Sequence, residues 1–166
     1  MIPLLILAAN IASSPDLGKA EGQCRANEQG PAFIVAIEGL KDRKGNLKLE
    51  LYPANDKDFL ADDNILISAG KAFRRVEMAV PATGAIQMCI RAPAAGTYAL
   101  SLLHDRDSNR KMGLSVDGIG FPGNPRLCWG KPGAKDALAT VGGGPARIAV
   151  TMQYRRNLVC FGPIQK

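Results

Sequence analysis

Asp105, Asp107 and Asn109 offer side-chain oxygens at every second residue, the spacing with which calcium-binding loops surround the ion. Calcium takes about six to eight oxygen ligands, so Asp117 and backbone carbonyls would have to supply others. The glycine expected at the sixth loop position is Arg110, and no distant bidentate Glu follows. Because Asp and Asn also cap their own backbone in Asx turns, we favour such a turn. Calcium held by Asp105, Asp107, Asn109 and Asp117 is the alternative, and otherwise we expect no cofactor.

His104 precedes Asp105 directly, and the pair suggests acid–base chemistry of the hydrolase type. Neighbouring residues at a strand end usually face different directions, and the sequence shows no partner nucleophile. We therefore expect a structural histidine that hydrogen-bonds the loop, and no catalytic residues. A hydrolase that uses His104 and Asp105 is the less favoured hypothesis.

Trp129, the only tryptophan, lies in the segment Leu127–Pro132. Such a residue can be a stacking platform for a ligand, but it more often packs over a neighbouring disulfide or sheet. We expect Trp129 to pack against the protein in this way.

A second acidic group surrounds Phe59 and Leu60, and we expect it to cap a helical turn that packs this apolar pair inward; its members are Asp56, Asp58, Asp62 and Asp63.

The N-terminus has the features of an export signal. Residues 2–12 are apolar, too short a run to span a bilayer, and lead into the polar segment 13–16. This pattern predicts a signal peptide over residues 1–20, with cleavage after Ala20 or, at a poorer site, after Ala12. No Lys or Arg precedes the run, so a buried first strand, or a start assigned too far downstream, is the alternative. We expect residues 21–166 to be periplasmic or secreted, without a transmembrane segment.

Four cysteines fit an oxidising compartment. No CxxC pair exists and the single histidine is remote in sequence from each cysteine, so a zinc site is poorly supported. An even number behind a signal predicts two disulfides, with three possible pairings; four reduced, buried thiols are the alternative. Cys24 and Cys160 lie at opposite ends of the strand-rich body, so we favour their pairing, which leaves Cys89 to pair with Cys128.

Period-two alternation of apolar residues gives the fold. It predicts strands at 33–38, 47–52, 75–80, 86–91, 97–103 and 147–153. The first two are expected to form a hairpin around the turn 42–46, and 65–67 to form a small strand. With 18 Gly and 11 Pro, the chain predicts one antiparallel β-sandwich of about seven strands, immunoglobulin-like or transthyretin-like, with a long Gly-rich loop from His104 to Ala139.

The formal net charge of +6 could suit an anionic partner. The basic residues are scattered, as in Arg74–Arg75 and Arg155–Arg156, and few aromatic residues lie among them. Nucleic-acid binding is therefore not expected.

Residues 93–109, PAAGTYALSLLHDRDSN, resemble the DUF2141 family of uncharacterised exported bacterial proteins, and the similarity extends over about residues 33–155. The resemblance implies an exported sandwich and implies no activity. The loop pattern of the family, H-D-x-N-x-N-G-K-L-D, departs here at Arg110 and Gly113. We expect a non-catalytic binding module for an unknown protein or small-molecule ligand, with the loop 104–139 as its variable surface.

Overall fold

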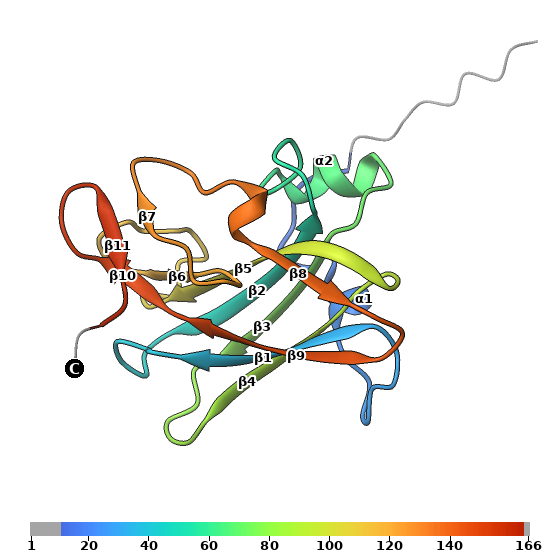
Figure 1. The fold of residues 1–166 in the computed structure, drawn as a ribbon, viewed down its shortest axis with the longest axis horizontal. Helices are drawn as coiled ribbons and strands as arrows, with labels where there is room; N and C mark the ends of the chain where they lie inside the picture. The colour runs from blue at the N-terminus through green and yellow to red at the C-terminus, as the bar shows by residue number, and fades with distance from the viewer. Residues whose placement is uncertain (1–10, 165–166) are drawn as a thin grey trace, which may run out of the picture.

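Two β-sheets packed face to face make up the computed structural model, which describes residues 11–164 (Figure 1). The small sheet has the order β4-β1-β9, with β4 at Ile86–Arg91, β1 at Ala32–Glu38 and β9 at Pro145–Thr151. The large sheet begins with β3 (Arg74–Ala79), β2 (Asn46–Pro53) and β5 (Gly96–Asp105) and continues through the short strands β6 (Gly118–Gly120), β10 (Gln153–Arg155), β11 (Cys160–Gly162) and β7 (Leu127–Cys128). β8 (Leu138–Val141) pairs with the first half of β5. The predicted sandwich is confirmed.

Alternating side chains of the two sheets form the core between them. In β1, Phe33, Val35 and Ile37 are buried, and they face the buried Leu47, Leu49 and Leu51 of β2. The same alternation buries Ile86, Met88 and Ile90 in β4. Each of the six predicted strands lies close to its expected bounds, because a strand that is half buried must place its apolar residues at every second position.

The expected hairpin between the first two strands is wrong. β1 pairs with β4 and, in parallel, with β9, whereas β2 pairs with β3 and β5. The chain crosses from one sheet to the other between β1 and β2, with Gly39 and Gly45 in the left-handed region (φ 70° and 71°). At Gly45 a Cβ atom would overlap the backbone of Asp105 and Arg106, so this crossing lies directly against the end of β5.

A second apolar cluster covers one end of the outer face of the large sheet. Tyr52 and Ala99 of the sheet contact Phe59, Phe73 and Phe121 from the covering segments. The predicted long loop contains strands β6 and β7 of the large sheet, a 3-10 turn at Ala134–Asp136 and the start of β8 (Figure 1), and it contributes Phe121 and Leu127 to this cluster.

The expected helical turn is present, closed by the Phe59 N–H on the Asn55 carbonyl (3.0 Å), with Phe59 buried and Leu60 partly buried. The expected capping by the aspartates is wrong, because Asn55 Oδ1 accepts the Asp58 N–H (3.0 Å) and Asp56 accepts the N–H of Ala134 (2.8 Å) instead.

The small strand expected at 65–67 is wrong, because these residues belong to helix α2 (Asp63–Ser68). Asp62 takes the N-cap position with an extended backbone. Leu66 is buried in the second cluster while Ile65 faces solvent. Three apolar or β-branched residues in a row suit a strand, but one turn of helix buries the middle residue equally well.

The N-terminal segment packs on β3 through helix α1 (Lys19–Gly22) and the residues before it. The Ser13 hydroxyl donates to Asp63 Oδ1 (2.6 Å), and the Arg75 guanidinium donates to the carbonyl oxygen of Ser14 (3.0 Å). The first ten residues of the predicted signal peptide lie outside the described residues. Within residues 11–164, no helix has the length and apolar character needed to cross a membrane.

Two disulfides are present, and the favoured pairing is wrong. Cys24 is bonded to Cys89 and Cys128 to Cys160. Cys89 is on the face of β4 that points away from the core, as its position in the alternation predicts, and there it meets the N-terminal segment. Cys128 and Cys160 are opposite each other in the β7–β11 ladder, with Cα atoms 4.2 Å apart. The C-terminal cysteine thus pairs with a strand neighbour that the sequence assigned to a loop.

Candidate functional site

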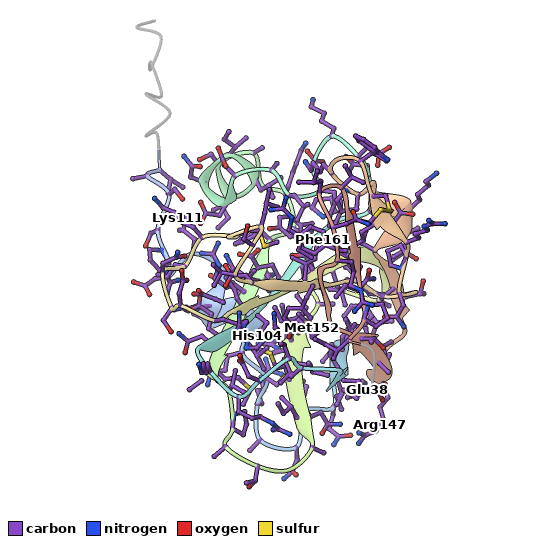
Figure 2. All side chains as sticks on the ribbon, turned by 90° about the vertical axis from the view of Figure 1, so that its left-hand side faces the viewer. Glu38, His104, Lys111, Arg147, Met152 and Phe161 are labelled. Carbon is purple, nitrogen blue, oxygen red and sulfur yellow. A yellow bond between two sulfur atoms is a disulfide. The ribbon has the colours of Figure 1, made fainter. Side chains whose placement is uncertain are left out.

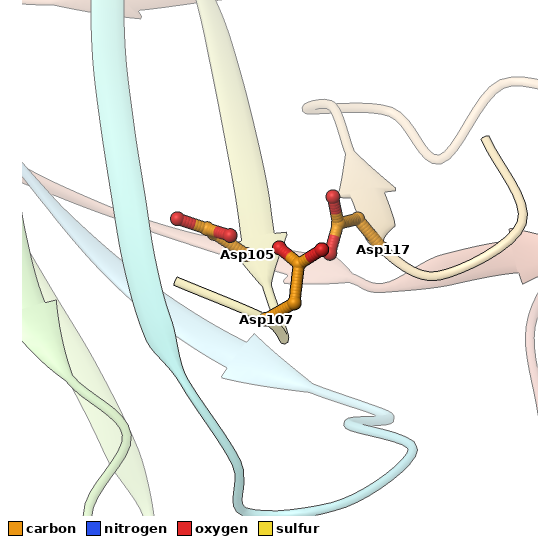
Figure 3. A group of neighbouring side chains, drawn as sticks. All are labelled: Asp105, Asp107 and Asp117. Atoms are coloured by element: carbon orange, nitrogen blue, oxygen red, sulfur yellow. The ribbon is translucent and has the colours of Figure 1, made fainter. Parts of the chain in front are cut away.

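Three carboxylates meet where β5 ends. Asp105 is the last residue of β5, Asp107 follows it in the turn, and Asp117 comes back beside them just before β6 (Figure 3). One oxygen of each lies within 4.8 Å of the others. The structure therefore brings together three of the four residues proposed as calcium ligands. Asn109 contacts this cluster by donating its side-chain amide to Asp107 Oδ2 (2.8 Å).

Backbone amides hold these side chains in place. Asp105 accepts the N–H groups of Asn109 (3.1 Å) and Arg110 (2.9 Å). Asp117 accepts those of Arg106 (2.8 Å) and Gly113 (2.7 Å). These bonds reach residues four or more positions away. The Asx turns favoured from the sequence occur instead at Asp107, which accepts the N–H of Asn109 (3.3 Å), and at Asn109, which accepts the N–H of Lys111 (2.8 Å). Arg110, which replaces the family's glycine, has a left-handed backbone (φ 67°), so the turn keeps the shape that glycine would give it.

The cluster carries uncompensated negative charge. Asp105 and Asp117 are only 4% and 1% exposed, and no side-chain nitrogen of a Lys, Arg or His in the described chain lies within 4.0 Å of the three carboxylates. Arg106, the nearest in sequence, directs its guanidinium to Asp42 instead. Buried like charges repel each other strongly unless a cation joins them, and hard cations prefer such oxygen ligands.

His104 faces the opposite side of β5 and is fully buried (0% exposed), inside the molecule (Figure 2). Its Nε2 lies 2.8 Å from the Lys44 carbonyl, which can only accept, so Nε2 carries the proton. Nδ1 therefore accepts the Tyr154 hydroxyl (2.6 Å), and that hydroxyl accepts the Lys41 N–H. Burial lowers the pKa of His104 and raises the pKa of Tyr154 to about 12. With both ring nitrogens bonded and no exposed surface, His104 has the contacts expected of a structural residue.

A groove lies on the outer face of the large sheet, beside the second apolar cluster, with a volume of about 710 Å³. Its floor contains Leu103 of β5 and Ile119 of β6, which are paired neighbours in the ladder. On one side is the loop that carries Met112 and Leu114. The opposite side is formed by β7, β11 and their loops, which the Cys128–Cys160 disulfide joins.

Trp129 stands at the mouth of this groove with 81% of its surface exposed, so the expectation that it packs is wrong. The backbone N–H of Trp129 donates to the carbonyl of Val159 (3.1 Å), and the Trp129 backbone is left-handed (φ 57°). Leu158, on the neighbouring turn, is 87% exposed. Two large apolar side chains at one rim are typical of a surface that a partner covers.

The charged groups that line the groove are Lys48, Lys131, Arg155 and Glu50. Glu50 already has three partners, because it accepts the Tyr52 hydroxyl (2.7 Å) and the Arg75 guanidinium (2.8 Å) and forms an ion pair with Lys48 (3.6 Å). Arg75 also contacts Asp63 (3.2 Å), and Glu50, Arg75 and Asp63 are all buried. The groove therefore presents cations to solvent, and its carboxylate is bound within the protein.

The sequence interpretation named the loop 104–139 as a binding surface but missed the groove residues themselves. One signal was available: Leu102 and Leu103 are adjacent in a strand, so one of them must face away from the inner core. Leu102 packs in the core between the sheets and Leu103 lies on the groove floor. The turn that carries Leu158 has no pattern that predicts its place.

Comparison with known proteins gives one match. No curated protein and no solved structure is significantly similar to this chain. The sequence model of one family, described as uncharacterized protein conserved in bacteria (DUF2141), matches residues 35–149. This match covers most of both sheets, from within β1 to within β9. The chain belongs to the DUF2141 family.

Proposed function

We propose that this protein is a non-catalytic binding module of an exported compartment and that its ligand binds in the groove beside Trp129. The observation that carries the proposal is the exposure of Trp129 and Leu158 at the rim of an apolar hollow. Its volume of about 710 Å³ is in the range of about 300–1,000 Å³ that small-molecule sites occupy. The two disulfides and the predicted signal support an oxidising location.

Because Trp129 is the only tryptophan and lines the groove, its fluorescence reports binding there. Titration with Nile red, an uncharged apolar dye, should saturate, with a blue shift of Trp129 emission because the indole leaves water. The double variant Leu114→Ser/Leu158→Ser removes exposed apolar surface from the groove and should weaken binding severalfold. Ile65→Ser is the matched control, since Ile65 is exposed on α2 and does not line the groove. An absence of saturable binding, or an equal loss in the control, would contradict the proposal.

A second function, calcium-dependent stabilisation, is favoured by the convergence of Asp105, Asp107 and Asp117. Calcium would join these carboxylates and remove their repulsion, so it should raise the melting temperature by several degrees relative to EDTA. Asp107→Asn should abolish this shift and leave the melting temperature in EDTA unchanged or higher, because Asp107 is exposed. Asp16→Asn, an exposed carboxylate in the N-terminal segment, is the control. Equal melting of the parent protein with calcium and with EDTA would rule out this function.

A further inference from the structure

We infer that the ligand of the groove is an amphiphile with one long hydrocarbon chain and an anionic head, of the class of long-chain carboxylates. The inference rests on the proposed function and specifies the chemistry of its ligand. Three observations carry it: where the net charge lies in the chain, which groove cations lack a carboxylate partner, and how few polar groups the floor offers.

The whole net charge of the protein belongs to the part of the chain that builds the groove wall. Residues 1–117 hold 14 basic and 14 acidic side chains, whereas residues 118–166 hold seven basic side chains and one acidic, which together give the net charge of +6. β6, β7, β10 and β11 all lie in this second part. This part of the chain is therefore strongly positive, and two of its basic side chains, Lys131 and Arg155, line the groove, where they attract anions.

Two cations of the groove have no acidic partner. Within residues 11–164, no carboxylate lies within 4.0 Å of the side-chain nitrogens of Lys131 or Arg155. Lys131 donates to the Phe59 carbonyl (2.8 Å), and Arg155 donates to Ser115 Oγ (2.9 Å) and to a neighbouring carbonyl. Neutral partners orient these side chains and leave their charge uncompensated. An anionic head could therefore bind either cation without displacing an ion pair.

The floor between these cations suits a hydrocarbon. Leu103, Ile119, Phe121 and Phe161 line it, and Ser101 is its main uncharged polar side chain. A ligand with polar groups along its length would lose hydrogen bonds to water there and gain few in return. A second copy of this chain is disfavoured as the occupant, because Lys131 and Arg155 of one copy would lie against the same cations of the other and repel them.

The test is a titration of Trp129 fluorescence with monomeric amphiphiles below their micelle concentrations. For octanoate, decanoate and dodecanoate, affinity should rise roughly fourfold per added methylene until the groove is full. At equal chain length, dodecanoate should bind severalfold more tightly than neutral dodecyl maltoside and cationic dodecyltrimethylammonium. Lys131→Gln/Arg155→Gln should remove this preference for the anion and keep the dependence on chain length.

Arg147→Gln is the matched control, because Arg147 is an exposed cation of the same basic segment on β9, away from Phe161 (Figure 2). It should leave the preference unchanged. Equal affinity for the three head groups would overturn the inference, as would binding to vesicles of anionic lipid without binding of monomers. If Nile red still binds in either case, the proposed function stands; if Nile red does not bind either, both fail.

Discussion

Loss of the Cys128–Cys160 disulfide should destabilise the protein and open the groove. β7 is two residues long, and in the described chain its ladder partner is β11 alone. The disulfide closes a loop of 32 residues, for which loop-closure entropy predicts a contribution of about 3.7 kcal/mol. For a domain of 166 residues, that corresponds to a fall in melting temperature of roughly 7–15 °C.

The Cys24–Cys89 disulfide provides the matched comparison. It closes 65 residues, so the same relation predicts a slightly larger contribution of about 4.3 kcal/mol. Thermal melts of Cys128→Ala/Cys160→Ala and Cys24→Ala/Cys89→Ala, read by far-UV circular dichroism, test both values. Trp129 emission and Nile red binding below the melt should change in the first variant only, because only that disulfide joins the groove wall. If the first variant melted within a degree of the parent and bound the dye normally, the argument would be refuted.

Three further predictions concern the interior and the N-terminus. His104 is neutral in the fold and is the only histidine. Because its pKa is lowered by burial, the unfolded chain takes up a proton below pH of about 6.5 that the folded chain does not. Urea melts should therefore show constant stability above that pH and a decline below it, which His104→Asn removes. Arg75→Met leaves the buried Asp63 without a cation and Glu50 with only Lys48, and it should lower the unfolding free energy by about 3–5 kcal/mol in the same assay; a loss below about 1 kcal/mol would show that the Arg75 ion pairs are dispensable. If the predicted signal is cleaved, the intact mass of protein isolated from the periplasm of an expressing bacterium should place its first residue at Ser13, because cleavage after Ala20 would remove the contacts of residues 13–15 with Asp63 and Arg75; a mature protein that starts at residue 21 would contradict this.

Strand positions could be predicted because they depend on local alternation. The leucines of β2 and the Ile–Met–Ile series of β4 are buried as the period of two requires. The turn at Gly45 could also be predicted from the sequence, since Gly45 has a left-handed backbone and glycine takes this conformation more easily than other residues. What the pattern does not contain is the identity of the neighbouring strand. β1 and β2 follow each other like a hairpin, yet each has enough apolar residues to lie in a different sheet.

The disulfide pairing failed for a related reason. Distance along the chain suggested that Cys24 and Cys160 staple the termini, but bonding depends on which strands become neighbours, and β7 was not recognised as a strand. The exposure of Trp129 was missed because nothing in the sequence indicates it. The residue lies in a turn with a left-handed backbone, a conformation that glycine and asparagine favour and tryptophan does not. The sequence did suggest that Asp117 lies near Asp105, because both were proposed as calcium ligands. It did not show the cause, which is that the chain returns beside β5 as strand β6.

The parallel pairing of β1 with β9 also determines when the protein can fold. β1 has two neighbours, and one of them begins at residue 145. A chain that emerges from its N-terminus, through a ribosome or a membrane pore, presents β1 more than a hundred residues before this partner is available. Contacts so distant in sequence slow folding. Until β9 is available, the edge of β1 that pairs with it keeps its backbone N–H and C=O groups unpaired. An open strand edge can pair with another chain, so this interval is when aggregation threatens.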